Sequence, residues 1–219
     1  MKRKFLFTMI VMALSVVFIS CDKEGDDEKK TEEVKATISF TSDDITLDLG
    51  STDANLLAFA TASDGSALTV SGVNYEMIGE QNATFKTGDV IAQKKVKVSC
   101  KKLAGLYQIA IKDDAKTYRQ GTCEVKMVAY NQLEIKGVSE WFGTTEIIAT
   151  FEDGEFNIPT IVAPVPYVDK SETIENFSTS FSNMTFEKSG NIYKLVAVDV
   201  LNYGKGIENM EFSLTFDKK

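Results

Sequence analysis

The sequence predicts an all-β protein built mainly from antiparallel strands. From Ala36 onward, apolar residues recur at every second position, which is the period of a half-buried strand. Threonine, valine, isoleucine and phenylalanine dominate these runs, as they do on pleated surfaces. No window sustains the i, i+3, i+4, i+7 spacing of an amphipathic helix. Short turns between such strands favour a sandwich or an open barrel over a βαβ fold.

Each predicted strand is defined by the apolar residues that share one of its faces. In chain order these sets are Ile38/Phe40, Ile45/Leu47/Leu49, Val96/Val98/Cys100, Tyr107/Ile109/Ile111, Cys123/Val125/Met127, Leu133/Ile135, Ile147/Ala149/Phe151, Phe156/Ile158, Met184/Phe186, Tyr193/Leu195/Ala197 and Met210/Phe212/Leu214/Phe216. Residues 170–181 come closest to a helical pattern, but their phenylalanines also fit a strand. We expect hairpin turns at residues 152–155, with Gly154 at a positive φ, and at residues 188–191.

The first twenty residues are typical of an export signal. Three basic residues, 2–4, precede an uncharged run at residues 5–18. This run is shorter than the roughly 20 residues of a membrane-spanning helix. It ends in Ile19-Ser20-Cys21, where a small residue directly precedes the cysteine. We therefore predict a signal peptide over residues 1–20, with a short uncleaved anchor as the alternative.

The segment Phe18-Ile19-Ser20-Cys21 resembles a bacterial lipobox, in which the cysteine thiol receives a diacylglyceryl group and becomes the new N-terminus. The resemblance implies lipidation at Cys21 and a membrane anchor made of acyl chains, at about 0.8 kcal/mol for each buried CH₂. Residues 22–33 contain no apolar side chain. We therefore expect residues 21–35 to be the lipidated cysteine and an acidic, disordered tether.

The acidic tether is similar to the export signal of Bacteroidota-type surface lipoproteins. This similarity implies a lipid-anchored protein of the outer membrane, exposed at the cell surface. Asp22, directly after the cysteine, would instead indicate retention in the inner membrane under enterobacterial sorting rules. The whole acidic cluster, rather than one residue, favours the outer surface.

The body is expected to contain two β modules that meet near residues 130–132, with one large sandwich as the alternative. Residues 83–89, the strand that ends at Cys100 and residues 106–111 resemble the end of an Ig-like β-sandwich, which we place at residues 36–131. Residues 149–151, Gly154 and residues 158–159 resemble a small β-meander module, sandwich or barrel-like, at residues 132–219. Neither resemblance implies a catalytic motif.

Composition excludes several classes of function. The absence of histidine excludes a Ser-His-Asp or Cys-His catalytic apparatus and a histidine-ligated metal. The net charge of −8 argues against a nucleic-acid partner. The acidic pairs lack calcium-loop spacing and lie where polar turn residues belong; they are Asp43-Asp44, Asp113-Asp114 and Glu152-Asp153. We expect no enzymatic activity, no metal and no cofactor.

Cys100 and Cys123 could form a disulfide in an exported protein, since both are in phase with core residues. A disulfide requires Cα atoms within about 7 Å of each other. A simple meander of the predicted strands would place the two cysteines about 20 Å apart, and only a crossover of the loop 113–121 would bring them together. Two buried free thiols are therefore favoured over a disulfide.

Three aromatic residues are the candidate ligand-binding residues. Trp141 and Phe142 lie between predicted strands, where an exposed pair could stack on a sugar ring. The alternative is that Trp141 completes the core of the C-terminal module. Tyr203 lies beside two glycines in a second expected loop.

The favoured function is therefore a non-catalytic binding or accessory module at the cell surface, with a glycan as the expected ligand. A second hypothesis is an envelope component that binds another protein through its sheet edges. A third is a small-lipid carrier, in which four apolar residues line a cavity in the C-terminal half. These residues are Met184, Met210, Phe212 and Phe216.

Overall fold

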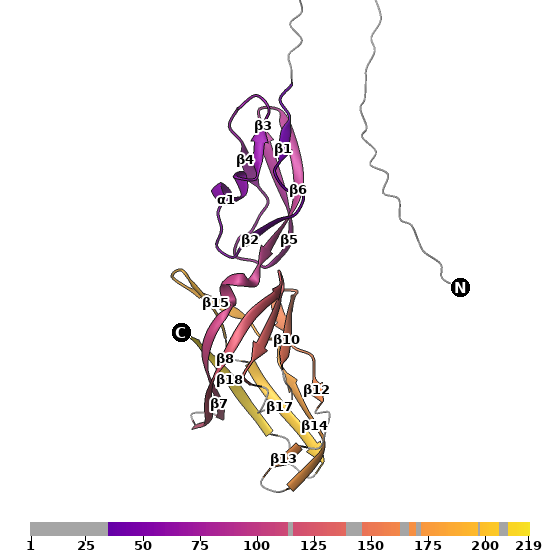
Figure 1. The fold of residues 1–219 in the computed structure, drawn as a ribbon, viewed down its shortest axis with the longest axis vertical. Coiled ribbons are helices and arrows are strands. Elements are labelled where there is room, and N and C mark those ends of the chain that lie inside the picture. The colour runs from indigo at the N-terminus through magenta and orange to yellow at the C-terminus, as the bar shows by residue number, and fades with distance from the viewer. Residues whose placement is uncertain are drawn as a thin grey trace, which may run out of the picture. The chain divides into compact units, whose positions relative to one another are not determined.

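β-Strands dominate the computed structural model, so the all-β prediction is confirmed (Figure 1). The structure describes residues 35–113, 116–138, 146–162, 167–169, 172–196, 198–205 and 210–219. Residues 35–219 form one unit by their internal contacts. The strands are mostly antiparallel, as expected from the short turns between them.

The N-terminal strands form two small sheets. β1 (Ile38–Phe40) pairs with β3 (Ala60–Ala62). The second sheet has the order β2-β6-β5-β4 and is made of β2 (Ile45–Asp48), β4 (Thr69–Ser71), β5 (Gly79–Thr87) and β6 (Val90–Ser99). β2 runs parallel to β6, which differs from the antiparallel expectation. Strand alternation does not encode direction, and the long connection between β2 and β6 permits a parallel crossover.

A short helix, α1 (Asp53–Leu57), follows β2 and was not predicted. Its five residues are too few to display a helical period. The local signal is a capping box, in which the Asn55 side chain accepts a hydrogen bond from the Thr52 backbone N–H at 2.9 Å. Leu56 is the buried residue of the helix.

The remaining strands form a ten-stranded sheet with the order β11-β10-β9-β8-β7-β18-β17-β14-β12, in which β13 also pairs with β14. Its strands are β7 (Gly105–Asp113), β8 (Lys116–Ala129), β9 (Gln132–Lys136), β10 (Ile147–Glu152), β11 (Glu155–Asn157), β12 (Ile161–Val162), β13 (Tyr167–Asp169), β14 (Glu172–Phe181), β17 (Val198–Lys205) and β18 (Met210–Lys218). The segment with a partly helical pattern is thus the strand β14. The last strand, β18, lies between β7 and β17.

The change from the small sheets to the large sheet occurs at a 3₁₀ helix, η1 (Cys100–Leu103). Residues 130–132, where the sequence predicts a boundary between modules, lie at the turn between β8 and β9, and these two strands pair with each other. Residues on both sides of this boundary therefore belong to one sheet. Alternation locates strands and turns, but it does not reveal which strands pair.

Both predicted hairpins are confirmed. Glu152 lies opposite Glu155 across the β10–β11 turn, and Gly154 has a φ of 96°. β15 (Phe186–Ser189) and β16 (Ile192–Leu195) form a two-stranded sheet with Ser189 opposite Ile192. We call this second pair the β15–β16 hairpin.

One large core cluster joins the N-terminal strands to the large sheet and the β15–β16 hairpin. Leu49, Ile78 and Val98 contribute to it from the N-terminal part, and Phe156 and Tyr193 contribute from the C-terminal part. A smaller cluster around Phe85 belongs to the N-terminal strands alone. The predicted inward faces are therefore largely correct.

Candidate functional site

Most of the sequence-predicted ligand residues lie where the structure gives no side-chain position. Cys21, Trp141 and Phe142 are outside the described residues. Tyr203 lies in β17, where its backbone is opposite Ser178, rather than in the expected loop. The candidate site is therefore built from other residues.

Cys100 and Cys123 are free and buried, so the structure contains no disulfide between them. The Cys100 backbone N–H donates to the Tyr130 carbonyl, just after β8, and its thiol lies 3.6 Å from the carbonyl oxygen of Ala129, the last residue of β8. Cys123 lies opposite Tyr107, six residues before Ala129. At strand spacing this places the cysteines about 20 Å apart, too far for a bridge.

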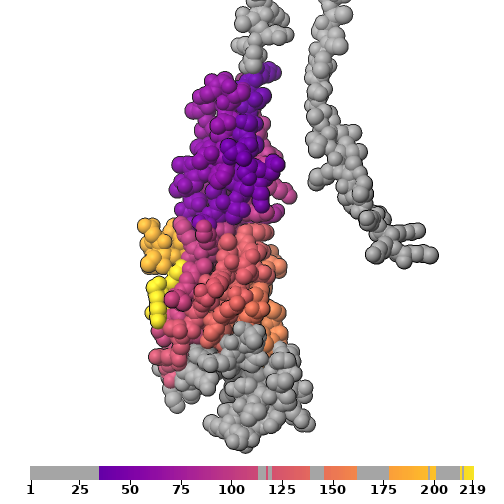
Figure 2. Space-filling view, in the orientation of Figure 1, coloured from indigo at the N-terminus to yellow at the C-terminus, as the bar shows by residue number. Residues whose placement is uncertain are grey.

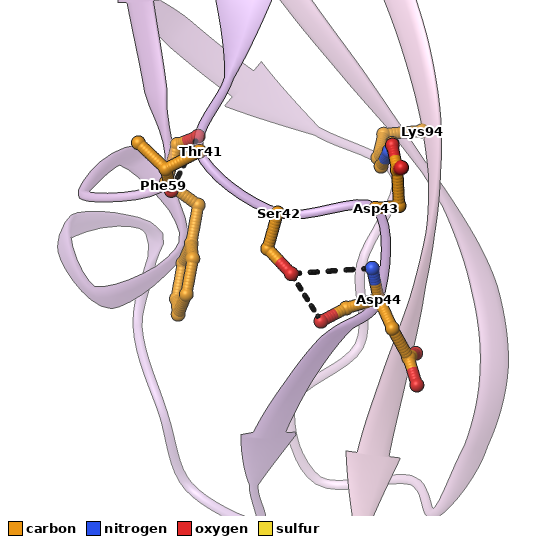
Figure 3. A network of polar contacts seen from close by, with 6 residues as sticks. All are labelled: Thr41, Ser42, Asp43, Asp44, Phe59 and Lys94. Atoms are coloured by element: carbon orange, nitrogen blue, oxygen red, sulfur yellow. Dashed lines mark hydrogen bonds and ion pairs between the residues drawn. The ribbon is translucent and has the colours of Figure 1, made fainter.

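The acidic pairs lie at turns, as expected. Asp43 pairs with Lys94 at 3.3 Å and Asp44 pairs with Lys97 at 3.0 Å. Figure 3 shows the Ser42 hydroxyl accepting a hydrogen bond from the Asp44 N–H at 3.2 Å and donating one to the Asp44 carbonyl at 2.9 Å. The carboxylates of Asp43 and Asp44, just before β2, therefore interact with lysine ammonium groups of β6.

The second acidic pair falls at the β7–β8 turn, where Asp113 lies opposite Lys116 and Asp114 is outside the described residues. The third pair forms the β10–β11 turn. No group of three metal-ligating side chains occurs within the described ranges.

The strongest candidate site is a pocket of about 260 Å³ beside the β15–β16 hairpin, which we call the lysine pocket. Three separate segments line it: η1, the turn and start of β16, and the end of β18. Its lining residues are Lys102, Asn191, Ile192, Tyr193, Lys218 and Lys219. Figure 2 shows the hairpin, in light orange, and the C-terminal residues, in yellow, side by side on one flank.

Lys218 is fixed in the lysine pocket by two backbone carbonyls. Its Nζ donates hydrogen bonds to the carbonyl oxygens of Lys102 at 2.5 Å and Tyr193 at 3.2 Å. The same atom lies 5.7 Å from the centre of the Tyr107 ring. Burial lowers the pKa of the Lys218 ammonium.

Tyr193 is the aromatic centre of the site and is only 2% exposed. The Nζ of Lys102 lies 5.4 Å from its ring centre and the Nζ of Lys188 lies 5.3 Å from it. The Tyr193 hydroxyl donates to the Glu76 carboxylate at 2.5 Å, and Lys188 pairs with that carboxylate at 2.6 Å. Two lysine ammonium groups therefore lie near the Tyr193 ring, whose hydroxyl is bonded to Glu76 in the turn between β4 and β5.

Glu76 has its pKa lowered by the hydrogen bonds from Lys188 and Tyr193, in that order of importance. Burial and the bond to Glu76 raise the pKa of the Tyr193 hydroxyl. Glu76 therefore stays ionised at neutral pH and is already engaged by two donors.

Comparison with known proteins yields one distant similarity. No family model matches the chain, and no curated protein matches it. Among solved structures, the chain is similar to the crystal structure of the lipoprotein BT2262 from Bacteroides thetaiotaomicron, with 11% sequence identity and a TM-score of 0.33. The similarity covers 84% of this chain and 100% of that chain. It is too distant to assign a family or a function.

Sequence reasoning did not find the lysine pocket. The sequence predicts a turn at residues 188–191 and gives no role to residues 217–219. Lys102 and Lys218 are separated by 116 residues, and only the pairing of β18 with β7 brings them together. No local motif could have revealed this.

Within the described part of the chain, no helix is long and apolar enough to cross a membrane.

Proposed function

We propose that the chain is an envelope lipoprotein whose β body acts as a non-catalytic binding or accessory module. The observation that carries the anchor is the segment Phe18-Ile19-Ser20-Cys21, which follows an uncharged run and precedes an acidic stretch. Acyl chains on Cys21 would hold the body at the outer membrane. The acidic residues after Cys21 support exposure at the cell surface.

The lysine pocket supports binding rather than catalysis. Its most buried amine, Lys218 Nζ, donates hydrogen bonds to two carbonyl oxygens, and these bonds favour its ammonium form although burial lowers its pKa. An ammonium has no free electron pair with which to attack a substrate. The six residues that line the pocket include no carboxylate side chain or thiol that could serve as a general base.

Lipidation is tested by expressing the full chain in a bacterial host with labelled palmitate. The wild-type protein is expected to incorporate label, to fractionate with outer membranes and to be cleaved by protease added to intact cells. Cys21→Ser should remove the label and release the protein from membranes. Label-free wild-type protein that stays in the cytosol with residue 1 intact would contradict the anchor.

A glycan is the favoured ligand of this module, and Trp141, Phe142 and Tyr203 are the residues expected to contact it. Affinity electrophoresis and glycan arrays should show retardation or binding that Trp141→Ala, Phe142→Ala or Tyr203→Ala reduces. Ile91→Ala is the control, because Ile91 is an exposed apolar residue on β6. Absence of binding across a broad panel would remove the glycan version.

A second candidate is an interaction component of the envelope. Two neighbouring apolar side chains on β8 favour it, since Met127 is 36% exposed and Val128 is 50% exposed. Pull-down from membranes should then recover a stoichiometric protein partner with the wild type and less of it with Val128→Lys. The lipid-carrier hypothesis is less favoured, because Met184 and Phe216 pack in the large core cluster.

A further inference from the structure

We propose that the lysine pocket binds an oxyanion, meaning a carboxylate, sulfate or phosphate group, carried by a small ligand or by one unit of a saccharide. The inference rests on the proposed binding function and names the chemistry of its ligand. It involves residues that have no part in the aromatic candidates Trp141, Phe142 and Tyr203.

The first argument is the local charge. Several lysines among the described residues pair with a nearby carboxylate, as Lys94, Lys97 and Lys188 illustrate. Lys102 and Lys218, by contrast, form no ion pair within the described part of the chain, although they share one pocket. A protein with a net charge of −8 therefore places in one pocket two lysines that form no ion pair with any described residue.

The nearby carboxylates form no ion pair or hydrogen bond with Lys102 or Lys218 within the described part of the chain. Glu76 accepts hydrogen bonds from Lys188 and from the hydroxyl of Tyr193. Asp217 precedes Lys218 in β18, and neighbouring side chains of a strand point to opposite faces. Glu76 attracts Lys102 through space but forms no ion pair with it. The charge of the pocket lysines is thus only partly offset, and a bound anion would offset more of it.

The second argument is the supply of donors. An ammonium carries three N–H donors, and carbonyl oxygens use two of those on Lys218. The third donor of Lys218, the Lys102 ammonium and the Asn191 amide remain for a ligand at the same pocket. The partial burial that lowers the Lys218 pKa also strengthens any charge-assisted hydrogen bond made there.

The size and walls of the pocket restrict the ligand. About 260 Å³ is below the range of roughly 300–1,000 Å³ that holds drug-sized ligands. The pocket therefore fits a single small anion or one unit of a longer chain. Ile192, which is 58% exposed, provides an apolar wall against which the C–H face of a sugar could lie.

The test is calorimetric titration of the lipidated full chain in neutral detergent with sulfate, inorganic phosphate, glucuronate and glucose at constant ionic strength. We expect saturable binding of at least one oxyanion and none of glucose. Glucuronate binding without inorganic anion binding would assign an acidic saccharide, and the reverse would assign a free inorganic anion. Binding should weaken as chloride is raised, because exposed charges are screened.

The variants locate the binding. Lys102→Met and Lys218→Met should each weaken it about tenfold or more, whereas Lys102→Arg should retain most of it. Lys86→Met is the matched control, because Lys86 is an exposed lysine of β5 away from the pocket lining. Lys102→Met is the decisive variant, since the Lys102 backbone carbonyl that holds Lys218 is unchanged.

Two outcomes would overturn the inference: no saturable oxyanion binding, or binding that Lys102→Met and Lys218→Met leave unchanged. Glycan binding that depends on Trp141 but not on the lysines would contradict the inference and leave the proposed function standing. Oxyanion binding by a protein that takes up no palmitate label at Cys21 would support the inference and contradict the proposed lipid anchor.

Discussion

Glu76, in the turn between β4 and β5, connects the N-terminal part of the chain to the β15–β16 hairpin by charge. Its carboxylate accepts a hydrogen bond from the Tyr193 hydroxyl in β16 and forms an ion pair with Lys188 in β15. Glu76 is itself exposed, so the ion pair with Lys188 contributes only about 0.2–1 kcal/mol. Lys188 has the larger effect on the Glu76 pKa, but the hydrogen bond from Tyr193 is the one whose donor residue is buried.

Replacing Glu76 by Gln should make the protein less sensitive to acid. The lowered folded-state pKa of Glu76 means that its contribution is fully present above the ordinary glutamate pKa of about 4.3 and is lost as pH falls through the lower folded value. Urea unfolding at pH 7 should show Glu76→Gln to be less stable by about 1 kcal/mol or less. The difference should shrink towards pH 3.

Glu80→Gln is the control for this measurement, because Glu80 is an exposed residue of β5 that forms no ion pair within the described ranges. Its stability difference from the wild type should stay small and change little with pH. An equal acid dependence in both variants would show that Glu76 does not link the two parts.

The buried thiols should be unreactive in the folded protein. Burial raises the pKa of Cys100 and of Cys123 to about 12. At pH 8 about one thiol in ten thousand would therefore be ionised, and neither is accessible. Ellman's reagent should detect no thiol in the native lipidated protein and two after unfolding without reductant.

The same raised pKa values add stability that is fully present below about pH 8.5, the ordinary thiol pKa, and is lost as pH rises towards 12. Zero thiols after unfolding would demonstrate a disulfide and contradict the structure.

At the scale of elements, Gly50 sets how closely the end of β2 approaches the β15–β16 hairpin. Its φ is 68°, and a Cβ there would overlap the hydroxyl of Tyr193 and lie 3.1 Å from the ring carbon that carries it. The Gly50 backbone N–H also donates to the Tyr75 carbonyl at 2.8 Å. Tyr193 can therefore reach Glu76 only because residue 50 has no side chain.

Gly50→Ala should destabilise the protein more than the backbone strain alone explains. Gly65→Ala provides the comparison, because Gly65 has a similar φ of 74° and open space around its Cα. We expect about 1 kcal/mol for Gly65→Ala and about 1–3 kcal/mol more for Gly50→Ala, measured by urea unfolding. Equal losses in the two variants would mean that Tyr193 moves aside freely.

Elements also mark the limit of what the sequence predicts. The alternation around Val98, Ile109 and Phe151 identifies inward faces, because strand burial has a period of two. Turn chemistry identifies the hairpin at Gly154. Neither signal contains the pairing of β18 with β7, which joins residues about a hundred positions apart. The lysine pocket depends on that pairing and so could not be predicted.

At the scale of the whole molecule, the position of η1 determines how the chain can be divided. The large sheet contains β7 and β8 from before residue 131 and β9, β10, β14, β17 and β18 from after it. A cut at the predicted boundary would separate β8 from β9 and β7 from β18. A cut after Ala104 would preserve every pairing of β1–β6 and the cluster around Phe85.

Fragments should therefore behave differently according to where the chain is cut. Residues 36–131 would carry an unpaired β7–β8 hairpin whose two edges and apolar face are exposed, and such edges promote aggregation. Residues 35–104 would instead keep their sheets and lose only the core contacts of residues such as Leu49, Ile78 and Val98. We expect residues 35–104 to remain monomeric in size-exclusion chromatography, with a strand-type circular dichroism spectrum and a lowered unfolding midpoint. Residues 36–131 should elute as aggregates, and a monomeric, cooperatively unfolding 36–131 fragment would restore the boundary at Asn131.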